Sequence, residues 1–564
     1  MFRDALRVDL AEAIARAMRA GAIPAGETPV FEVEIPKDRR HGDYATNAAL
    51  ILAKRTGGKP RDLAQLLIDA YAPPPDRIAR LEVAGPGFIN ISVAWPWKQE
   101  LVATICRLGE TFGLQTIGAG RRVNVEFVSA NPTGPLHVGT GRGAVVGDIL
   151  ANLLAALGFD VAREYYINDA GQQVQNLALS VQAHYFELLG RQLPWPADGY
   201  RGDYVHDLAQ RIQMTDGDRW LQASENERLE RFREFSVDAM VQDIREVLGL
   251  FGVQFDTWFS ERALVRSGQV DRALAALQER GYIYEADGKL WFRSTAFGDD
   301  KDRVIVKPTG EWTYFGSDIA YHLDKRARGF GLMIDVWGID HIGDVARVKG
   351  GLQALGVGPD ALEILIHQHV RLKNEGEVLR MAKRSGEFVA LRDLIDAVGR
   401  DAARYFYAMT SYTVPMDFDV TLATRHSQDN PVYYVQYAHA RVAGILREAG
   451  AVVGGSTTPG TGGAAASGGG APLHRLGDDR EASLIHALAE LPEVIRLAGL
   501  RREPHRLCAY AREVAEAFHL FYTHCRVLTD DAELTAARLA LVDAARLALR
   551  RVLGLVGVSA PDRM

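Results

Sequence analysis

Four residues that could bind a phosphate lie within five positions of one another: His137, Gly139, Thr140 and Gly141. An imidazole and a hydroxyl can donate hydrogen bonds to phosphate oxygens, and glycines leave backbone N–H groups open to a ligand. Residues 123–128 before them alternate as a short β-strand does, and apolar residues between 146 and 157 recur at helical spacing. The stretch therefore predicts a strand, a glycine-rich turn and a helix whose positive dipole end faces an anion.

The glycine spacing excludes two common nucleotide motifs. It does not follow the dinucleotide fingerprint, and no Gly-Lys-Ser or Gly-Lys-Thr follows it as in a P-loop. A second strand at 161–167 completes a βαβ unit, and further strands are expected at 332–337 and 362–366. These patterns predict a parallel sheet of the α/β class.

Composition sets broad limits on the function. The 564 residues suffice for three or four domains, and 47% hydrophobic with 24% charged residues is typical of a globular protein. The formal net charge of −7 does not indicate a nucleic-acid partner, so such a partner would have to bind local basic patches on the surface. The three cysteines form no CxxC pair, which argues for a reducing compartment and against a cysteine-based zinc site. No apolar run is long enough to cross a bilayer, so we expect a cytoplasmic protein without a membrane partner.

The chain divides by pattern into three parts. Residues 1–115 read as an α+β module, 116–425 as the nucleotide-binding part and 426–564 as nearly all helical. Within the second part, 180–300 reads as an insertion and 378–388 as a mobile basic loop. Within the third, 450–471 is rich in Gly, Ala, Ser and Thr, which predicts a flexible surface insertion.

Several segments resemble the arginyl-tRNA synthetases, a class I aminoacyl-tRNA synthetase family. Pro-Leu-His-Val-Gly-Thr resembles the His-Ile-Gly-His motif of the class, and NPTGPLHVGTGRGAVVGD and REYYINDAGQQ resemble this family in particular. HGDYATNAALILAK resembles its N-terminal appended domain, and DNPVYYVQYAHAR its anticodon-binding domain. RMAKRSG, at 380–386, resembles the second class I motif, Lys-Met-Ser-Lys-Ser. The resemblance implies a multidomain α/β protein: a Rossmann-like catalytic domain with an insertion, an N-terminal α+β domain that contacts the tRNA elbow, and an all-α anticodon-binding domain.

The resemblance assigns residues to ATP. Those expected at ATP are His137, Gly139, Thr140, Gly141, Gly338, Asp340, Met381 and Lys383. Of these, His137, Thr140 and Lys383 would be catalytic, acting on the phosphates. Without the resemblance, a lone histidine is more often a helix cap or a structural residue. The chain departs from the family motifs at Thr140, where a second histidine is expected, and at Arg380 and Ala382.

Recognition of arginine requires carboxylates that face a planar guanidinium. The residues assigned to arginine by the resemblance are Glu126, Asn131, Tyr314, Asp318 and His341. Tyr314 and Asp318 are four residues apart and could share one helix face. The alternatives are a surface carboxylate for Glu126 and a charge at a helix start for Asp318.

The implied reaction is ATP-dependent activation of L-arginine to arginyl-adenylate, followed by transfer to the 2′-OH of the terminal adenosine of tRNA(Arg). ATP with Mg²⁺ would be the substrate, no metal site on the protein is predicted, and a monomer is what the resemblance implies. Another class I synthetase remains an alternative. So does a catalytically impaired tRNA-binding paralogue, which Thr140, Arg380 and Ala382 motivate.

Overall fold

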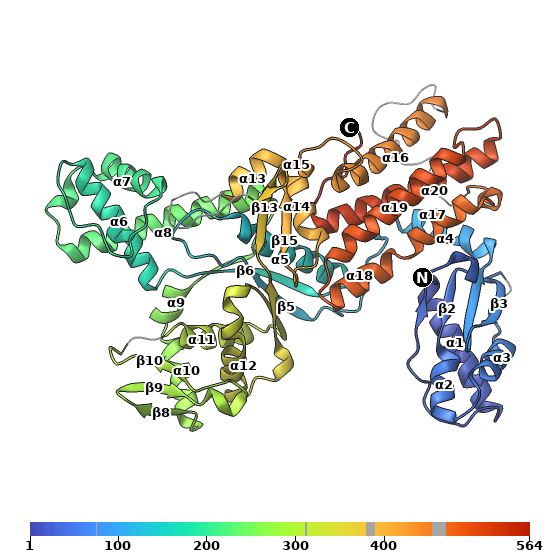
Figure 1. The fold of residues 1–564 in the computed structure, drawn as a ribbon, viewed down its shortest axis with the longest axis horizontal. Helices are drawn as coiled ribbons and strands as arrows, with labels where there is room; N and C mark the ends of the chain where they lie inside the picture. The colour runs from blue at the N-terminus through green and yellow to red at the C-terminus, as the bar shows by residue number, and fades with distance from the viewer. Residues whose placement is uncertain (75, 311–312, 379–389, 454–469) are drawn as a thin grey trace.

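The computed structural model describes residues 1–564 except 75, 311–312, 379–389 and 454–469. Figure 1 shows an elongated molecule in which the N-terminal module and the helices α6 and α7 lie at opposite ends. Residues 379–388 of the predicted mobile loop and most of the predicted glycine-rich insertion fall outside the described residues, whereas Val378 ends a short strand, β14 (Glu377–Val378). Residues 450–453 of that insertion belong to a helix instead, α16 (Pro431–Val453).

The N-terminal module is a four-stranded antiparallel sheet with helices. Its sheet order is β1-β2-β4-β3, and its elements are α1 (Phe2–Arg19), β1 (Val33–Glu34), β2 (Tyr44–Thr46), α2 (Ala48–Thr56), α3 (Pro60–Ala70), β3 (Ile78–Ala84) and β4 (Phe88–Val93). Helix α4 (Trp95–Leu108) leads onward to the central sheet. The module contacts the C-terminal helices through an ion pair from Arg7 to Glu493 and a hydrogen bond from Tyr44 to Glu490.

The central sheet has five parallel strands in the order β12-β11-β5-β6-β7. They are β5 (Arg122–Phe127), β6 (Asp160–Ile167), β7 (Thr257–Ser260), β11 (Leu332–Gly338) and β12 (Leu362–His367). The chain proceeds outward from β5 in one direction and then resumes at β11 on its other side. Such a doubly wound sheet binds ligands at the carboxyl ends of its strands, where the order reverses. Here that point lies between β5 and β11.

Helix α5 (Val138–Ala156) lies directly on β5 because Gly147 has no side chain. A Cβ at Gly147 would lie 2.1 Å from Cγ of Phe127, a distance that atoms do not tolerate. Val123, Val125 and Phe127 of β5 are almost fully buried, as expected for a central strand covered on both faces. The first predicted strand and helix thus form the centre of the main hydrophobic core.

Two groups of elements are inserted into this frame. The helices α6 (Gln172–Leu188), α7 (Asp203–Asp216) and α8 (Glu225–Leu250) follow β6 and have their own core. After β7 come α9 (Glu261–Arg266), α10 (Gln269–Glu279) and an antiparallel sheet of β8 (Ile283–Ala286), β9 (Lys289–Phe292) and β10 (Arg303–Val306). The range expected to be an insertion, 180–300, therefore contains one strand of the central sheet, β7. Four half-buried residues give this strand no clear alternating pattern.

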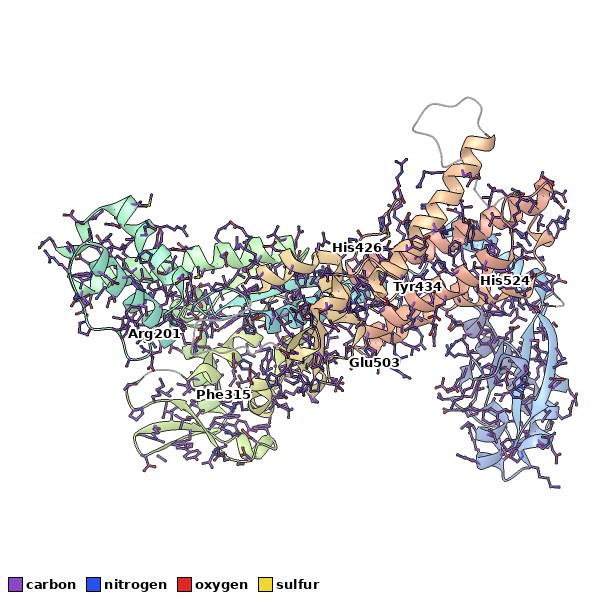
Figure 2. All side chains as sticks on the ribbon, turned by 45° about the horizontal axis from the view of Figure 1, so that its top comes forward. Arg201, Phe315, His426, Tyr434, Glu503 and His524 are labelled. Atoms are coloured by element: carbon purple, nitrogen blue, oxygen red, sulfur yellow. The ribbon has the colours of Figure 1, made fainter. Side chains whose placement is uncertain are left out.

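The chain returns to the sheet through α11 (Tyr314–Ala327), and the short 3₁₀ helix η5 (Ile339–Asp344) and α12 (Val345–Ala354) follow β11. Phe315, at the start of α11, packs into the core beside β9 (Figure 2). Beyond β12 come β13 (Val370–Asn374), β14 (Glu377–Val378), α13 (Leu391–Val398), α14 (Arg400–Met409), β15 (Met416–Asp419) and α15 (Val420–Ala423).

The C-terminal part is helical, as predicted. It consists of α16, α17 (Asp479–Ala489), α18 (Leu491–Leu500), α19 (His505–His524) and α20 (Ala532–Val556), which pack together as Figure 1 shows. Among the described residues, no helix is both long enough and apolar enough to cross a membrane.

Candidate active site

The predicted phosphate-binding residues lie at the carboxyl end of β5, where the sheet order reverses. His137 is the residue before α5, and the backbone N–H of Thr140 bonds its carbonyl oxygen at 2.9 Å. The His137 side chain is exposed, and Gly139 and Thr140 are partly exposed in the first turn. Gly338 and Asp340, the other ATP residues described, stand at the end of β11 on the opposite side of the reversal.

The segment after the second motif meets the first motif directly. His137 and Ala390 form an isolated antiparallel bridge, and the N–H of Leu391 bonds the carbonyl of Leu136 at 2.7 Å. Met381 and Lys383 themselves lie outside the described residues. Ala390, the first described residue after this segment, is nevertheless held next to His137 by the bridge.

Tyr407 holds the first residues of α5 in place through a hydrogen bond to the backbone. Its buried hydroxyl donates to the carbonyl of Val138 at 2.6 Å, one residue after His137, and its ring lies against Gly141. We therefore treat Tyr407 as a positioning residue for His137.

We expect Tyr407→Phe to lower the rate of amino-acid activation about fivefold, because one neutral hydrogen bond contributes roughly 1 kcal/mol. The assay is arginine-dependent ATP–pyrophosphate exchange. Tyr405→Phe is the matched control, since the hydroxyl of Tyr405 bonds the carbonyl of Cys508 on α19 instead. Equal losses in both variants would show that Tyr407 acts only on stability.

The predicted carboxylates occupy the same edge of the sheet but differ in environment. Glu126, at the end of β5, is buried and accepts hydrogen bonds from Lys325 at 2.6 Å and from Ser129 at 2.9 Å. Lys325 also bonds Asp335 at 2.9 Å, and His322 bonds the other oxygen of Asp335 at 2.7 Å. Glu126 is thus already paired with an internal cation, which the sequence did not indicate.

Glu126, His322 and Asp335 could be taken for a metal site, because one ligand atom from each lies within 4.8 Å of the others. The ammonium of Lys325 bonds both carboxylates, however, and supplies the positive charge itself. The geometry is that of a buried ion-pair cluster.

Asp318 stands in the first turns of α11, and no ion pair joins its carboxylate to another described residue. Burial raises its pKa to about 7, and the nearby carboxylates of Glu126, Glu261 and Asp344 add to that rise, while His322 opposes it. A carboxylate in this state favours a ligand that carries positive charge.

Glu261 is a functional candidate that the sequence reasoning missed. It is the first residue of α9, directly after β7, and only 4% of its surface is exposed. Its Oε2 and the hydroxyl of Tyr166 are buried without a hydrogen-bond partner among the described residues. Burial raises the pKa of Glu261. Burial also raises the pKa of Tyr166, and the carboxylate of Glu261 adds to that rise. No motif precedes Glu261, and only its position after a strand of the central sheet could have suggested it.

The other residues that the resemblance assigns to arginine lie on three further segments. Asn131 follows β5 and donates to Gln173 of α6 at 2.7 Å. His341 lies in η5 and pairs with Asp344 at 3.5 Å, which raises the pKa of the histidine. Asp318 also contributes to that rise, so the two residues face one neighbourhood. Tyr314 begins α11, and its side chain is not described.

Three models of known protein families match this chain. The model of the class I tRNA synthetase catalytic domain of the arginine type matches residues 108–407. The arginyl-tRNA synthetase N-terminal domain matches 4–93, and the DALR anticodon-binding domain matches 435–564. The family match over residues 108–407 and the doubly wound parallel sheet together define a class I aminoacyl-tRNA synthetase.

Individual relatives narrow the class further. An arginine–tRNA ligase of Geobacillus thermodenitrificans is 47% identical over 564 residues, which cover 100% of this chain and 99% of the relative. One of Moorella thermoacetica is 47% identical over 559 residues, covering 99% and 98%. The Thermus thermophilus arginyl-tRNA synthetase structure shares the fold with a TM-score of 0.74 at 24% identity, and each chain is covered fully. The chain belongs to the arginyl-tRNA synthetase family.

Proposed function

We propose that this protein is an arginine–tRNA ligase. The observation that carries the proposal is the pair Asp318 and Glu261, two carboxylates that no described cation neutralises, next to a nucleotide-type sheet edge. A guanidinium can bond two carboxylates at once through its planar fork. Tyr314 joins this set by resemblance, and Asn131 and His341 take the α-amino end of the substrate. Glu126 is paired with Lys325, and its charge still adds to the rise in the pKa of Asp318, so we assign it a supporting role behind the two carboxylates.

In the first step, a carboxylate oxygen of arginine attacks the α-phosphorus of ATP, and the bond to the leaving pyrophosphate breaks. His137 and Thr140 hydrogen-bond the α-phosphate as negative charge grows on it, and the start of α5 adds its positive dipole end. Gly139 and Gly141 let the nucleotide approach the backbone. Asp340, beside Gly338, holds the ribose. Lys383 and Met381 come from the second motif, with Lys383 at the β- and γ-phosphates of MgATP.

In the second step, the 2′-OH of the terminal adenosine of tRNA(Arg) attacks the arginyl carbonyl carbon, and AMP leaves. Side chains that could stack on anticodon bases lie on the helical part: ring centroids of Tyr433 and Tyr437 are 6.3 Å apart, and His426 stacks on Tyr433 at 5.9 Å. Figure 2 shows His426 and Tyr434 in this region, far from Arg201 of the inserted helices. Stacking on aromatic side chains is a common way to bind unpaired bases.

Most arginines near these aromatic residues are already paired with carboxylates and are therefore less free to bind tRNA phosphates. Arg496 pairs with Glu493 at 2.7 Å, Arg502 with Glu363 at 2.8 Å, and Arg506 pairs with Glu503. Arg441 instead lies over the rings of Tyr437 and Tyr522, each 5.1 Å from the ring centroid. We therefore assign the anticodon contact to the aromatic row with Arg441. The three parts of the molecule, 1–115, 116–425 and 426–564, would contact the tRNA elbow, acceptor end and anticodon of one tRNA, with the protein acting as a monomer in the cytoplasm.

The proposal is tested by ATP–pyrophosphate exchange with L-arginine, with and without tRNA(Arg). Citrulline is the matched analogue, since it replaces the guanidinium by a neutral group of the same shape. Exchange should require arginine and fall at least 100-fold with citrulline, because the analogue leaves buried carboxylates unpaired. Binding of tRNA without exchange under either condition would favour an inactive tRNA-binding paralogue.

Thr140 gives a separate prediction about rate. A neutral hydroxyl in place of a charge-assisted donor costs on the order of 1 kcal/mol, so Thr140→His should speed activation about five- to tenfold. Thr140→Val, which keeps the shape but removes the donor, should slow it by a similar factor. Identical exchange rates in all three proteins would remove Thr140 from the phosphate site.

A further inference from the structure

His367 lies beside Gly143 in the first half of α5, although no motif points to it. It is the last residue of β12 and pairs in register with Gly338 at the end of β11. Its Nε2 lies 3.1 Å from the position that a Cβ would take at Gly143 and 3.7 Å from the corresponding position at Gly338. No side chain can therefore stand between the imidazole and these two glycines, which flank the carboxyl edge of the sheet.

The segment that carries His367 is held firmly. Arg142 of α5 is fully buried and donates from Nη1 to the carbonyl of Gln368 at 3.0 Å and from Nη2 to the carbonyl of Ser411 at 2.8 Å. The N–H of Gln368 donates to the carbonyl of Tyr412 at 2.9 Å. The imidazole is thus positioned by contacts to its own neighbour rather than by a partner at its tip.

The imidazole can offer an acceptor at the carboxyl end of β12. Its Nδ1 lies 3.4 Å from the carbonyl oxygen of Gln368, which can only accept, so this contact fits the tautomer that carries its proton on Nδ1 and its lone pair on Nε2. Burial lowers the pKa of His367 to about 4, and the neighbouring Arg142, His137 and His369 oppose its protonation further. Across residues 1–378 and the later described segments, Nε2 has no hydrogen-bond partner. A neutral ring with an open acceptor recognises a donor.

We propose that His367 selects the base of the nucleotide, its Nε2 accepting a hydrogen bond from the 6-amino group of adenine. Guanine carries an oxygen at that position, whose lone pairs would oppose the lone pair of Nε2. The inference rests on the proposed function, because that function supplies ATP as the ligand at this edge of the sheet. It adds the residue that reads the base.

The test compares ATP with purine riboside 5′-triphosphate, which is ATP without the 6-amino group. The parent protein should prefer ATP about tenfold in kcat/KM for arginine-dependent exchange, since one buried hydrogen bond is lost with the analogue. In His367→Leu the KM for ATP should rise about tenfold, with kcat little changed, and the preference should vanish. His367→Gln, whose amide oxygen can reach the position of Nε2, should keep part of it.

His369→Leu is the matched control, because His369 is an exposed histidine two residues further along the same segment. It should retain the full preference. Equilibrium binding of the two nucleotides by calorimetry repeats the comparison without catalysis, so a parent that binds ATP selectively but fails to exchange would refute the proposed function alone. An unchanged preference in His367→Leu, a loss in His369→Leu, or a parent that binds both nucleotides equally would overturn the role of His367.

Discussion

Asp318→Asn is expected to abolish arginine-dependent ATP–pyrophosphate exchange, with a loss of at least 100-fold in kcat/KM for arginine. The substitution keeps the size of the side chain and removes its charge. Asp318 and Glu261 are the two carboxylates of the pocket that no described cation neutralises, so the guanidinium would lose half of its charged partners. Breaking one member of a buried charge pair costs roughly 3–5 kcal/mol, which is a factor of 100 or more.

The same residue predicts how arginine binding depends on pH. Only the ionised carboxylate pairs with a guanidinium, and the pKa of Asp318 in the free protein is raised to about 7. The affinity for arginine should therefore increase between pH 6 and pH 8 and level off above. In Asp318→Asn this dependence should become weaker, because Glu261 is then the only carboxylate of the pair that titrates, and calorimetric titration at several pH values measures the difference.

The free energy of unfolding of the protein without arginine should fall with rising pH, whereas the affinity for arginine rises. A carboxyl whose pKa is higher in the folded state than its ordinary value of 3.8 binds its proton more tightly when folded, so the free energy of unfolding falls as pH rises from about 4 to about 7. Asp318→Asn should consequently melt at a higher temperature than the parent at pH 8 and at a similar one at pH 4.

Asp324→Asn is the control, since Asp324 lies on the same helix but pairs with Arg328 at 2.7 Å. It should leave exchange and its pH dependence unchanged. A parent-like exchange rate in Asp318→Asn would remove Asp318 from the arginine pocket.

The elements that the sequence predicted well are those with strong local patterns. The strands β5 and β11 have uninterrupted apolar faces, and the structure has them within one residue of the predicted positions. The helix α5 ends one residue before the last predicted apolar position but begins at Val138, eight residues before the first one. The short strand β7 has no such face, and its place in the sheet depends on pairing with β6. Sheet order is a long-range property that a local pattern does not contain.

The site residues differ in the same way: some could be predicted from their own segment, whereas others depend on contacts between distant parts of the chain. His137 and the glycines belong to one continuous segment, so their spacing alone indicated a phosphate. The pairing of Glu126 with Lys325 joins residues 199 positions apart, and neither has a local feature that indicates the other. Glu261 and His367 likewise stand at the carboxyl end of the sheet only because the strands β7 and β12 run parallel and end there. Predicting them requires the strand order first.

Arg404 is the second residue whose substitution should have a large effect, in this case on the stability of the protein. No sequence pattern indicated its role. Its fully buried guanidinium donates to the carbonyl of Val556 at 2.9 Å and to that of Phe251 at 3.0 Å, and it pairs with Asp148 of α5. Val556 ends α20, and Phe251 follows the end of α8. The guanidinium of Arg404 therefore caps the C-termini of α20 and α8 and also neutralises the carboxylate of Asp148 on α5.

We expect Arg404→Ala to destabilise the protein by roughly 3–5 kcal/mol, because it leaves Asp148 and the helix-end carbonyls buried without a donor. The melting midpoint, followed by circular dichroism, should fall by several degrees. Activation should fall with it, since α5 also positions His137. Arg400→Ala is the matched control: Arg400 begins the same helix, is exposed, and makes one bond of 3.3 Å to the carbonyl of Gly557. If both variants melted at the temperature of the parent, the helical and catalytic parts would have to be joined mainly by apolar packing, and Arg404 would not link them.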